Sequence, residues 1–193
     1  MTAAGFSPEA LCEWRPPEKR DIAKARDLTE TGAMTAMANV PFSTVFNQDV
    51  FSLTPALIDE ALGNTPIAIV AGSLQCDSFS NMKSQTVKDL GEEMGDAELF
   101  YPVLRLIEKT QRAAVFIENV PAFLVSEIGG AFKAILQHLG YFVSQATLNS
   151  ADFGSRTSLP HGFLVASIWP GFEFPAQTAR PESPLYDWLG TGR

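Results

Sequence analysis

Residues 113–120 read AAVFIENV, an apolar run that closes on Glu118 and Asn119. Two further runs of this kind are PIAIVAGS at 66–73 and GFLVASIW at 162–169, and turn residues bound all three. Short stretches of near-continuous hydrophobicity are typical of strands in a parallel sheet that is covered on both faces. We therefore expect the three runs to be the buried strands of one sheet.

Weaker strand patterns and helical patterns surround these runs. The weaker strand patterns cover 8–14, 43–51 and 141–149. The helical patterns cover 54–63, 96–111 and 129–140. In the last of them we expect one apolar face made of Phe132, Ile135, Leu136 and Leu139. Alternation of strands and helices at this spacing predicts an α/β fold, with a Rossmann-like, mostly parallel sheet and helices on both faces.

The composition fits a domain of this kind, because 193 residues are enough to bury a sizeable core. No run approaches the ~18–20 apolar residues that span a membrane. Glu and Pro interrupt the N-terminal stretch where a signal peptide is apolar, so we expect a cytoplasmic protein of a bacterial cell or a virus-infected host cell. Cys12 and Cys76 are the only cysteines and the chain has 2 His, so we expect no metal site.

The chain is acidic, with 14 Lys+Arg against 22 Asp+Glu and a net charge of −8. A protein that holds DNA unaided usually presents a basic face to the phosphates. We therefore expect DNA binding by the chain alone to be weak, and the acidic balance suits a protein partner.

Polar residues that suit a ligand site follow four of the expected strands, and ligands of doubly wound sheets bind at the carboxyl ends of strands. The residues are Glu13, Trp14, Asp49, Cys76, Glu118 and Asn119. Burial of Glu118 at a strand end would raise the pKa of its carboxyl group and let it donate a proton. Taken singly, Glu13 and Asp49 fit helix N-caps or solvated loop acids better, and Cys76 fits an inert buried thiol.

In their order and spacing, these residues resemble the DNA (cytosine-5) methyltransferase family. QCDSFS at 75–80 is similar to that family's Pro-Cys-Gln-x-Phe-Ser loop, and FIENVPAFL at 116–124 carries its Glu-Asn-Val motif. LNSADFG at 148–154, GFLVAS at 162–167 and FEFPAQT at 172–178 resemble later segments of the family. The resemblance covers residues 4 to about 180.

The resemblance implies methyl transfer from S-adenosylmethionine to C5 of a cytosine that is flipped out of the duplex. Cys76 would attack C6 as a thiolate, because only the covalent adduct makes C5 nucleophilic. Glu118, protonated and beside Asn119, would hold N3 and the exocyclic amine of the base. The cofactor contacts implied by the resemblance are Glu13, Trp14, Asp49 and Ser73.

The chain also departs from the family's pattern. Gln75 and Asp77 stand where Pro and Gln flank the nucleophile, and a neighbouring carboxylate raises the pKa of a thiol. The Gln-x-Arg-x-Arg motif falls on TSLPH at 157–161, so Leu159 and His161 occupy the two arginine positions. Neither Leu nor a neutral His replaces a bidentate guanidinium. A further family arginine aligns with Ala97.

We further expect 1–180 to be an incomplete catalytic domain, without the family's first strand and its Phe-x-Gly-x-Gly loop, and 181–193 to be a C-terminal tail. The family's target-recognition domain is also expected to be absent. Strand edges left open in this way predict pairing between chains, in a homodimer or a hetero-complex.

Two hypotheses of function follow. The first is a degenerate, catalytically inactive homologue that has weak or no S-adenosylmethionine binding and acts by binding a protein. Such a protein would be a viral or mobile-element inhibitor of a host defence system, or a regulatory subunit. The second is the catalytic half of a split methyltransferase that still uses the cofactor. We expect His138 on a helix surface and His161 in a loop.

Overall fold

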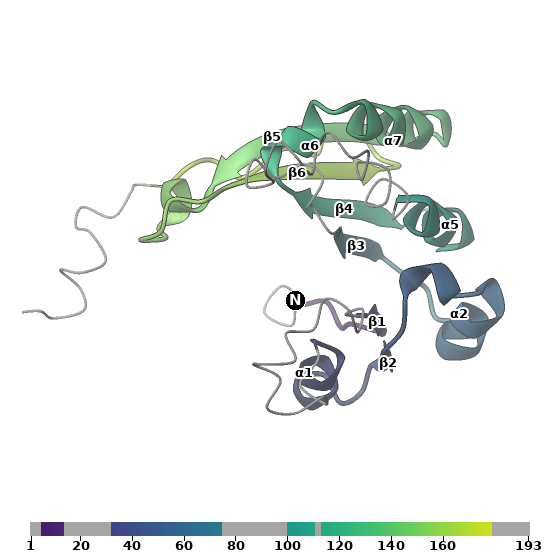
Figure 1. Cartoon of the computed structure of the whole chain (residues 1–193). Helices are drawn as coiled ribbons and strands as arrows, with labels where there is room; N and C mark the ends of the chain where they lie inside the picture. Colours follow the sequence, from purple (N-terminus) through teal and green to yellow (C-terminus); the bar gives the residue numbers. More distant parts are fainter. Residues whose placement is uncertain (1–4, 14–31, 75–99, 111–112, 179–193) are drawn as a thin grey trace, which may run out of the picture. The chain divides into compact units, whose positions relative to one another are not determined.

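The computed structural model of the protein describes residues 5–13, 32–74, 100–110 and 113–178 (Figure 1). The chain divides into two compact units, Met1–Pro66 and Ile67–Arg193. The expected boundary between 1–180 and the tail lies outside the described residues. None of the helices in the described ranges has the length and apolar character that crossing a bilayer requires.

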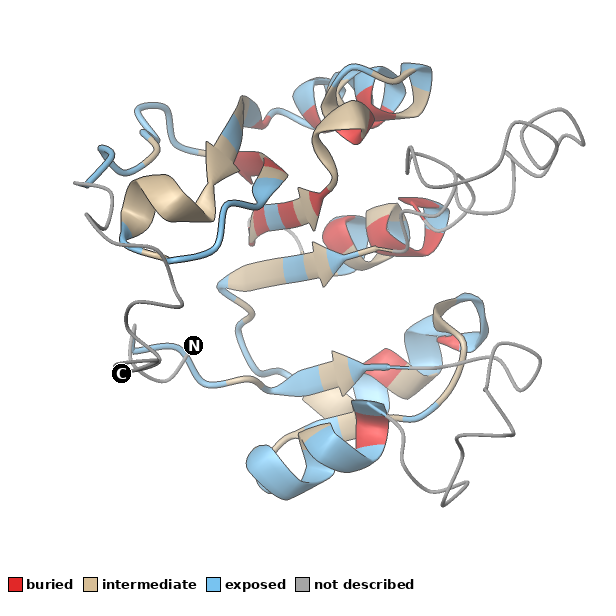
Figure 2. Cartoon of the chain, turned by 60° about the vertical axis from the view of Figure 1, so that its left-hand side comes forward, coloured by how far each residue is buried: buried red, intermediate tan, exposed pale blue. Residues whose placement is uncertain are grey.

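The first unit is a parallel strand pair with short helices. Strand β1 (Ala10–Cys12) pairs with β2 (Thr44–Phe46), and the helices are α1 (Gly32–Asn39), η3 (Val50–Ser52) and α2 (Pro55–Leu62). Helix α2 begins where its sequence predicts, because Thr54 accepts a hydrogen bond from the Leu57 amide and Pro55 occupies the first helical position. Buried residues are few in these helices, as Figure 2 shows.

The second unit is built on a four-stranded sheet with the order β3-β4-β6-β5. Its elements are β3 (Ile69–Ser73), α5 (Phe100–Thr110), β4 (Ala114–Asn119), α6 (Pro121–Leu124), α7 (Glu127–His138), β5 (Phe142–Asn149), η4 (Ser150–Phe153) and β6 (Pro160–Ser167). Strands β3 and β4 are parallel, and β6 is antiparallel to both β4 and β5. The sheet is therefore mixed, with three of its four strands in one direction, which confirms the α/β fold.

Strand β6 is the exception among the three runs expected to be parallel. Only residues 150–159 connect β5 to β6, and a parallel neighbour needs a crossover of about a dozen residues or more. The chain therefore turns back on itself and places β6 between β4 and β5.

The core of this unit lies on one face of the sheet. Val115 and Ile117 of β4 pair with Ala166 and Leu164 of β6, so all four side chains point to the same face. Helices α5, α6 and α7 bury their apolar residues against this face, and those residues are Phe100, Val103, Ile107, Phe123, Phe132 and Leu136. The rings of Phe100 and Phe123 stack with centroids 4.8 Å apart.

The opposite face carries the alternate residues of the same strands. On it, Phe116 of β4 is 39% exposed and Phe142 of β5 is 54% exposed. Glu118 and the side chains that contact it also lie on this face, because Glu118 is two residues from Phe116 in β4. The polar site is thus separated from the apolar core by the sheet itself.

Candidate functional site

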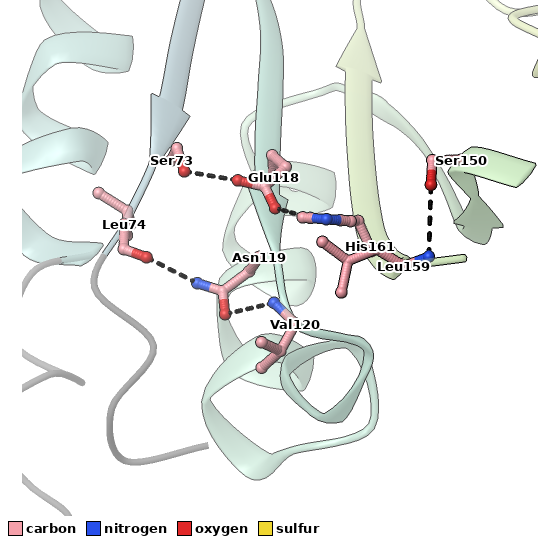
Figure 3. A network of polar contacts seen from close by, with 8 residues as sticks. All are labelled: Ser73, Leu74, Glu118, Asn119, Val120, Ser150, Leu159 and His161. Atoms are coloured by element: carbon pink, nitrogen blue, oxygen red, sulfur yellow. Dashed lines mark hydrogen bonds and ion pairs between the residues drawn. The ribbon is translucent and has the colours of Figure 1, made fainter. Parts of the chain in front are cut away.

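A chain of three polar side chains lies where β3 and β4 end and β6 begins (Figure 3). The Ser73 hydroxyl donates a hydrogen bond to Oε2 of Glu118 at 2.5 Å. Nδ1 of His161 lies 2.5 Å from the other carboxylate oxygen, Oε1. Both oxygens of Glu118 therefore have a partner from a neighbouring strand.

Sheet register explains why these residues meet. Ser73 is the direct partner of Glu118 across the parallel β3–β4 pair. Phe163 is the direct partner of Glu118 across the antiparallel β4–β6 pair, and His161 is two residues before it on the same face. The three side chains thus come from neighbouring strands and one face.

His161 lies within β6, so the expectation that it lies in a loop is wrong. Residues 150–159 fold back so that the Leu159 amide is held by the Ser150 hydroxyl and by Oδ1 of Asn149. This contact extends the β5–β6 ladder to Pro160, and His161 becomes the partner of Leu148. His138 lies exposed in the last turn of α7, as expected.

The ionisation of Glu118 also differs from the sequence-based expectation. Burial raises the pKa of this carboxyl group, as predicted. The hydrogen bonds from Ser73 and His161 and the charge of His161 lower the pKa, and together they outweigh the effect of burial. The net pKa of Glu118 lies below its ordinary value. The lowered pKa favours the carboxylate form of Glu118, which accepts hydrogen bonds, whereas the sequence predicts a raised pKa and a proton donor.

Asn119 points to the other face of the sheet and does not join this chain of contacts. It is 2% exposed, its amide donates to the Leu74 carbonyl at 3.3 Å, and its Oδ1 accepts from the Val120 amide at 2.8 Å. Asn119 thus ties the end of β3 to the start of α6, which holds the strand end that carries Glu118 in place.

Glu13 and Asp49 follow β1 and β2 at the carboxyl ends of that parallel pair. The Glu13 amide donates to the Phe46 carbonyl at 3.0 Å and continues the ladder. Oδ1 of Asp49 accepts from the Phe51 amide at 2.9 Å and caps η3, so Asp49 has the N-cap role that it fits when taken singly.

Cys12 lies near the carboxylates of Glu13 and Asp49, and the sequence analysis did not predict this proximity. Burial raises the pKa of its thiol to about 11, with smaller contributions from Asp49 and then Glu13. Its Sγ donates to the Gln48 carbonyl at 3.3 Å. Cys12 is therefore a thiol and not a thiolate at neutral pH, and its position at the end of β1 was the signal that could have found it.

The described residues include only some of the expected site residues. Cys76 and Trp14 lie outside the described residues, as do Gln75, Asp77 and Ala97. Leu159, at one of the family's arginine positions, is 55% exposed. The structure therefore brings together Ser73, Glu118 and His161 in one unit, and Glu13, Asp49 and Cys12 in the other.

The described residues fit the adenosine end of S-adenosylmethionine in part. Glu13 is exposed and its carboxylate is an acceptor for ribose hydroxyls, and Asp49 keeps one carboxylate oxygen beyond its cap for an amine. Ser73 fits less well, because its hydroxyl already donates to Glu118. Among the residues that the structure describes, no group of three or more His, Cys, Asp or Glu side chains is arranged to hold a metal ion.

Comparison with known proteins finds similarity to DNA methyltransferases. The family model for C-5 cytosine-specific DNA methylase matches residues 35–157. The chain is 28% identical over 163 residues to the type II methyltransferase M.AquIA of Picosynechococcus sp., an alignment that covers 77% of this chain and 64% of that protein. It is 28% identical over 112 residues to the type II methyltransferase M.MspI of Moraxella sp., which covers 55% of this chain and 26% of that protein.

A solved structure supports the fold. The Entamoeba histolytica methyltransferase EhMeth superposes with a TM-score of 0.62 at 17% identity, covering 91% of this chain and 58% of that one. The chain thus spans less than two thirds of the length of each of these relatives.

Proposed function

We propose that this chain, which belongs to the C-5 cytosine-specific DNA methylase family, is a degenerate homologue. It does not methylate DNA alone and acts by binding another protein. Such a protein would inhibit a host defence system or regulate an active methyltransferase, and we expect it in the cytoplasm. The observation that carries the proposal is the state of Glu118, whose two carboxylate oxygens are engaged by Ser73 and His161.

Methyl transfer to cytosine by this family's chemistry needs a protonated carboxyl group against N3 of the base. In this chain the pKa of Glu118 is lowered, which favours the ionised form. A carboxylate that faces N3, itself an acceptor, makes no hydrogen bond there. Substitution of the family's arginine by His161 supports the same conclusion, because an imidazole lacks the fork of donors that a guanidinium presents.

The strand edges and the charge support a protein partner. In the part of the chain that the structure describes, β3 pairs with β4 alone and β1 pairs with β2 alone. Unpaired strand edges are templates for pairing with another chain, in a homodimer or a hetero-complex. The net charge of −8 suits a partner with a basic surface and disfavours the DNA backbone.

Calorimetry with S-adenosylmethionine tests this proposal, together with transfer of a labelled methyl group to duplex DNA. We expect no saturation at micromolar cofactor and no label in DNA, while an active member of the family, run in parallel, shows both. Micromolar binding together with methyl transfer by the isolated chain would overturn the proposal.

A second candidate is the catalytic half of a split methyltransferase. It is favoured by the retained Glu118–Asn119 strand end, which Asn119 anchors on both sides, and by Glu13 and Asp49 at one end of β1 and β2. Co-expression with the products of neighbouring genes would then restore methylation, and Cys76→Ser in the same complex would abolish it. Inactivity with each of those products would remove this candidate.

A further inference from the structure

We propose that His161, and not Glu118, is the group that meets a ligand at this site. Glu118 accepts a hydrogen bond from the Nδ1–H group of His161, which leaves Nε2 as the free proton acceptor. The inference goes beyond the proposed function, because it concerns the proton chemistry of the site and holds whether or not the chain methylates DNA.

Both carboxylate oxygens of Glu118 are already engaged in hydrogen bonds. Ser73 donates to Oε2 and the His161 ring contacts Oε1, each at 2.5 Å. Displacing either partner would remove a hydrogen bond to a charged acceptor, which is a stronger bond than one between neutral groups. Glu118 therefore acts as a positioning residue, and Ser73 fixes the rotamer that lets it do so.

The ring of His161 faces Glu118 through Nδ1. A neutral imidazole carries one proton, and a carboxylate accepts hydrogen bonds only. With Nδ1 at 2.5 Å from an ionised Glu118, that proton lies on Nδ1, so the lone pair of the neutral ring lies on Nε2.

The side chain of His161 is more accessible to a ligand than that of Glu118. The side chain of His161 is 38% exposed, against 25% for Glu118. Within the described residues, Nε2 has no hydrogen-bond partner, since the one polar contact of the ring is through Nδ1. The ring lies 6.4 Å from that of Phe163, so an aromatic side chain borders the imidazole on the same face of the sheet.

This arrangement suits a ligand that presents an N–H or O–H donor, such as a base amine or a sugar hydroxyl. In a full transfer, the proton leaves the donor for Nε2 and the donor keeps the electron pair. The resulting imidazolium retains its Nδ1–H bond to Glu118, and the reverse step returns the proton. No redox partner or metal is needed.

The histidine content makes a direct test possible, because the chain has 2 His and the second, His138, is an exposed helix residue that serves as an internal reference. Long-range proton–nitrogen NMR on the full chain labelled with ¹⁵N-histidine, at pH 8.5, distinguishes the two tautomers. We expect His161 to carry its proton on Nδ1 and His138 to show the ordinary Nε2–H form. An Nε2–H tautomer at His161 in the wild-type chain would overturn the proposal, and this measurement needs no variant.

A chemical probe provides the second measurement. Diethyl pyrocarbonate acylates the unprotonated imidazole nitrogen, and peptide mass spectrometry separates the two sites. We expect His161 to react faster than His138, and Glu118→Gln to slow it by about tenfold, equivalent to ~1.4 kcal/mol. Glu108→Gln, the same carboxylate-to-amide change at an exposed position of α5, is the control and should leave the rate unchanged. Equal rates in the wild type and Glu118→Gln would contradict the positioning role.

Discussion

The pKa of the Glu118 carboxyl group is lowered because the contributions of Ser73 and His161 together outweigh burial. Its lowered folded-state pKa means that its contribution to stability is present above pH 4.5, the ordinary value, and is lost as the pH falls through the folded-state pKa. This sign is opposite to that expected of the buried, proton-donating acid that the sequence predicts.

Glu118→Gln tests that sign. The variant should lower the free energy of unfolding at pH 7, and the difference from the wild type should shrink as the pH falls below 4.5, because the wild-type carboxylate then protonates as well. Urea unfolding at a series of pH values measures both chains. Glu108→Gln, an exposed position on α5, is the matched control. A difference that grows on acidification would contradict the assignment.

Cys12 gives a second prediction at this scale. With a thiol pKa of about 11, Cys12 should react with iodoacetamide far more slowly at pH 8 than a free thiol, because the thiolate is the nucleophile. Measuring the Cys76→Ser chain isolates this cysteine. Asp49→Asn in that background should raise the rate, since it removes a neighbouring negative charge. A rate like that of a small-molecule thiol would show that the carboxylates and burial have no effect.

Helix α7 shows what decides stability at the scale of one element. It starts at Glu127, two residues before the expected start, because Ser126 caps it by accepting from the Gly129 amide at 3.0 Å. Phe132 is buried as expected, but Ile135 is 38% exposed and Leu139 is 39% exposed, so the buried face is narrower than the apolar pattern. A helix pattern predicts which residues share a face, but not how far the neighbouring sheet covers it.

The adjacent glycines of α7 provide a matched pair. A Cβ at Gly129 would lie 2.1 Å from the Phe123 carbonyl oxygen, whereas a Cβ at Gly130 would meet nothing within 4 Å. Gly129→Ala should destabilise the chain by about 1–3 kcal/mol, the usual cost of overpacking. Gly130→Ala should be neutral or stabilising by up to ~1 kcal/mol, because Gly is a poor helix former. Urea unfolding of both variants decides, and equal effects would contradict the close approach of α7 to α6.

The net charge governs the behaviour of the whole molecule toward DNA. At −8, the chain should bind a labelled duplex no more tightly than ~10⁻⁴ M at physiological salt, the weak end of non-specific binding. Fluorescence anisotropy at two salt concentrations measures this, with an active family member as the positive control. Submicromolar binding whose affinity falls steeply with salt would reveal a basic face and would favour the split-enzyme candidate.

Much of the fold could be predicted because it depends on local patterns. The apolar runs at 66–73, 113–120 and 162–169 became β3, β4 and β6, and Thr54, Pro55 and Gly63 bound α2 as their conformational preferences require. Helix α1 was missed, because its sequence GAMTAMAN has no clear apolar period and no acidic or basic residue at its ends. The Glu-Asn-Val strand end and the family were likewise accessible from sequence alone.

The contacts of the site could not be predicted in the same way. By itself, the sequence determined which segments form strands and that Glu118 ends one of them, since hydrophobic periodicity is a property of neighbouring residues. Only the tertiary structure decided that β6 lies antiparallel beside β4 and brings His161 to Glu118 across 43 positions of sequence. Strand order and register follow from the free energy of the whole sheet, and a carboxylate acquires its pKa from the groups that this register places around it.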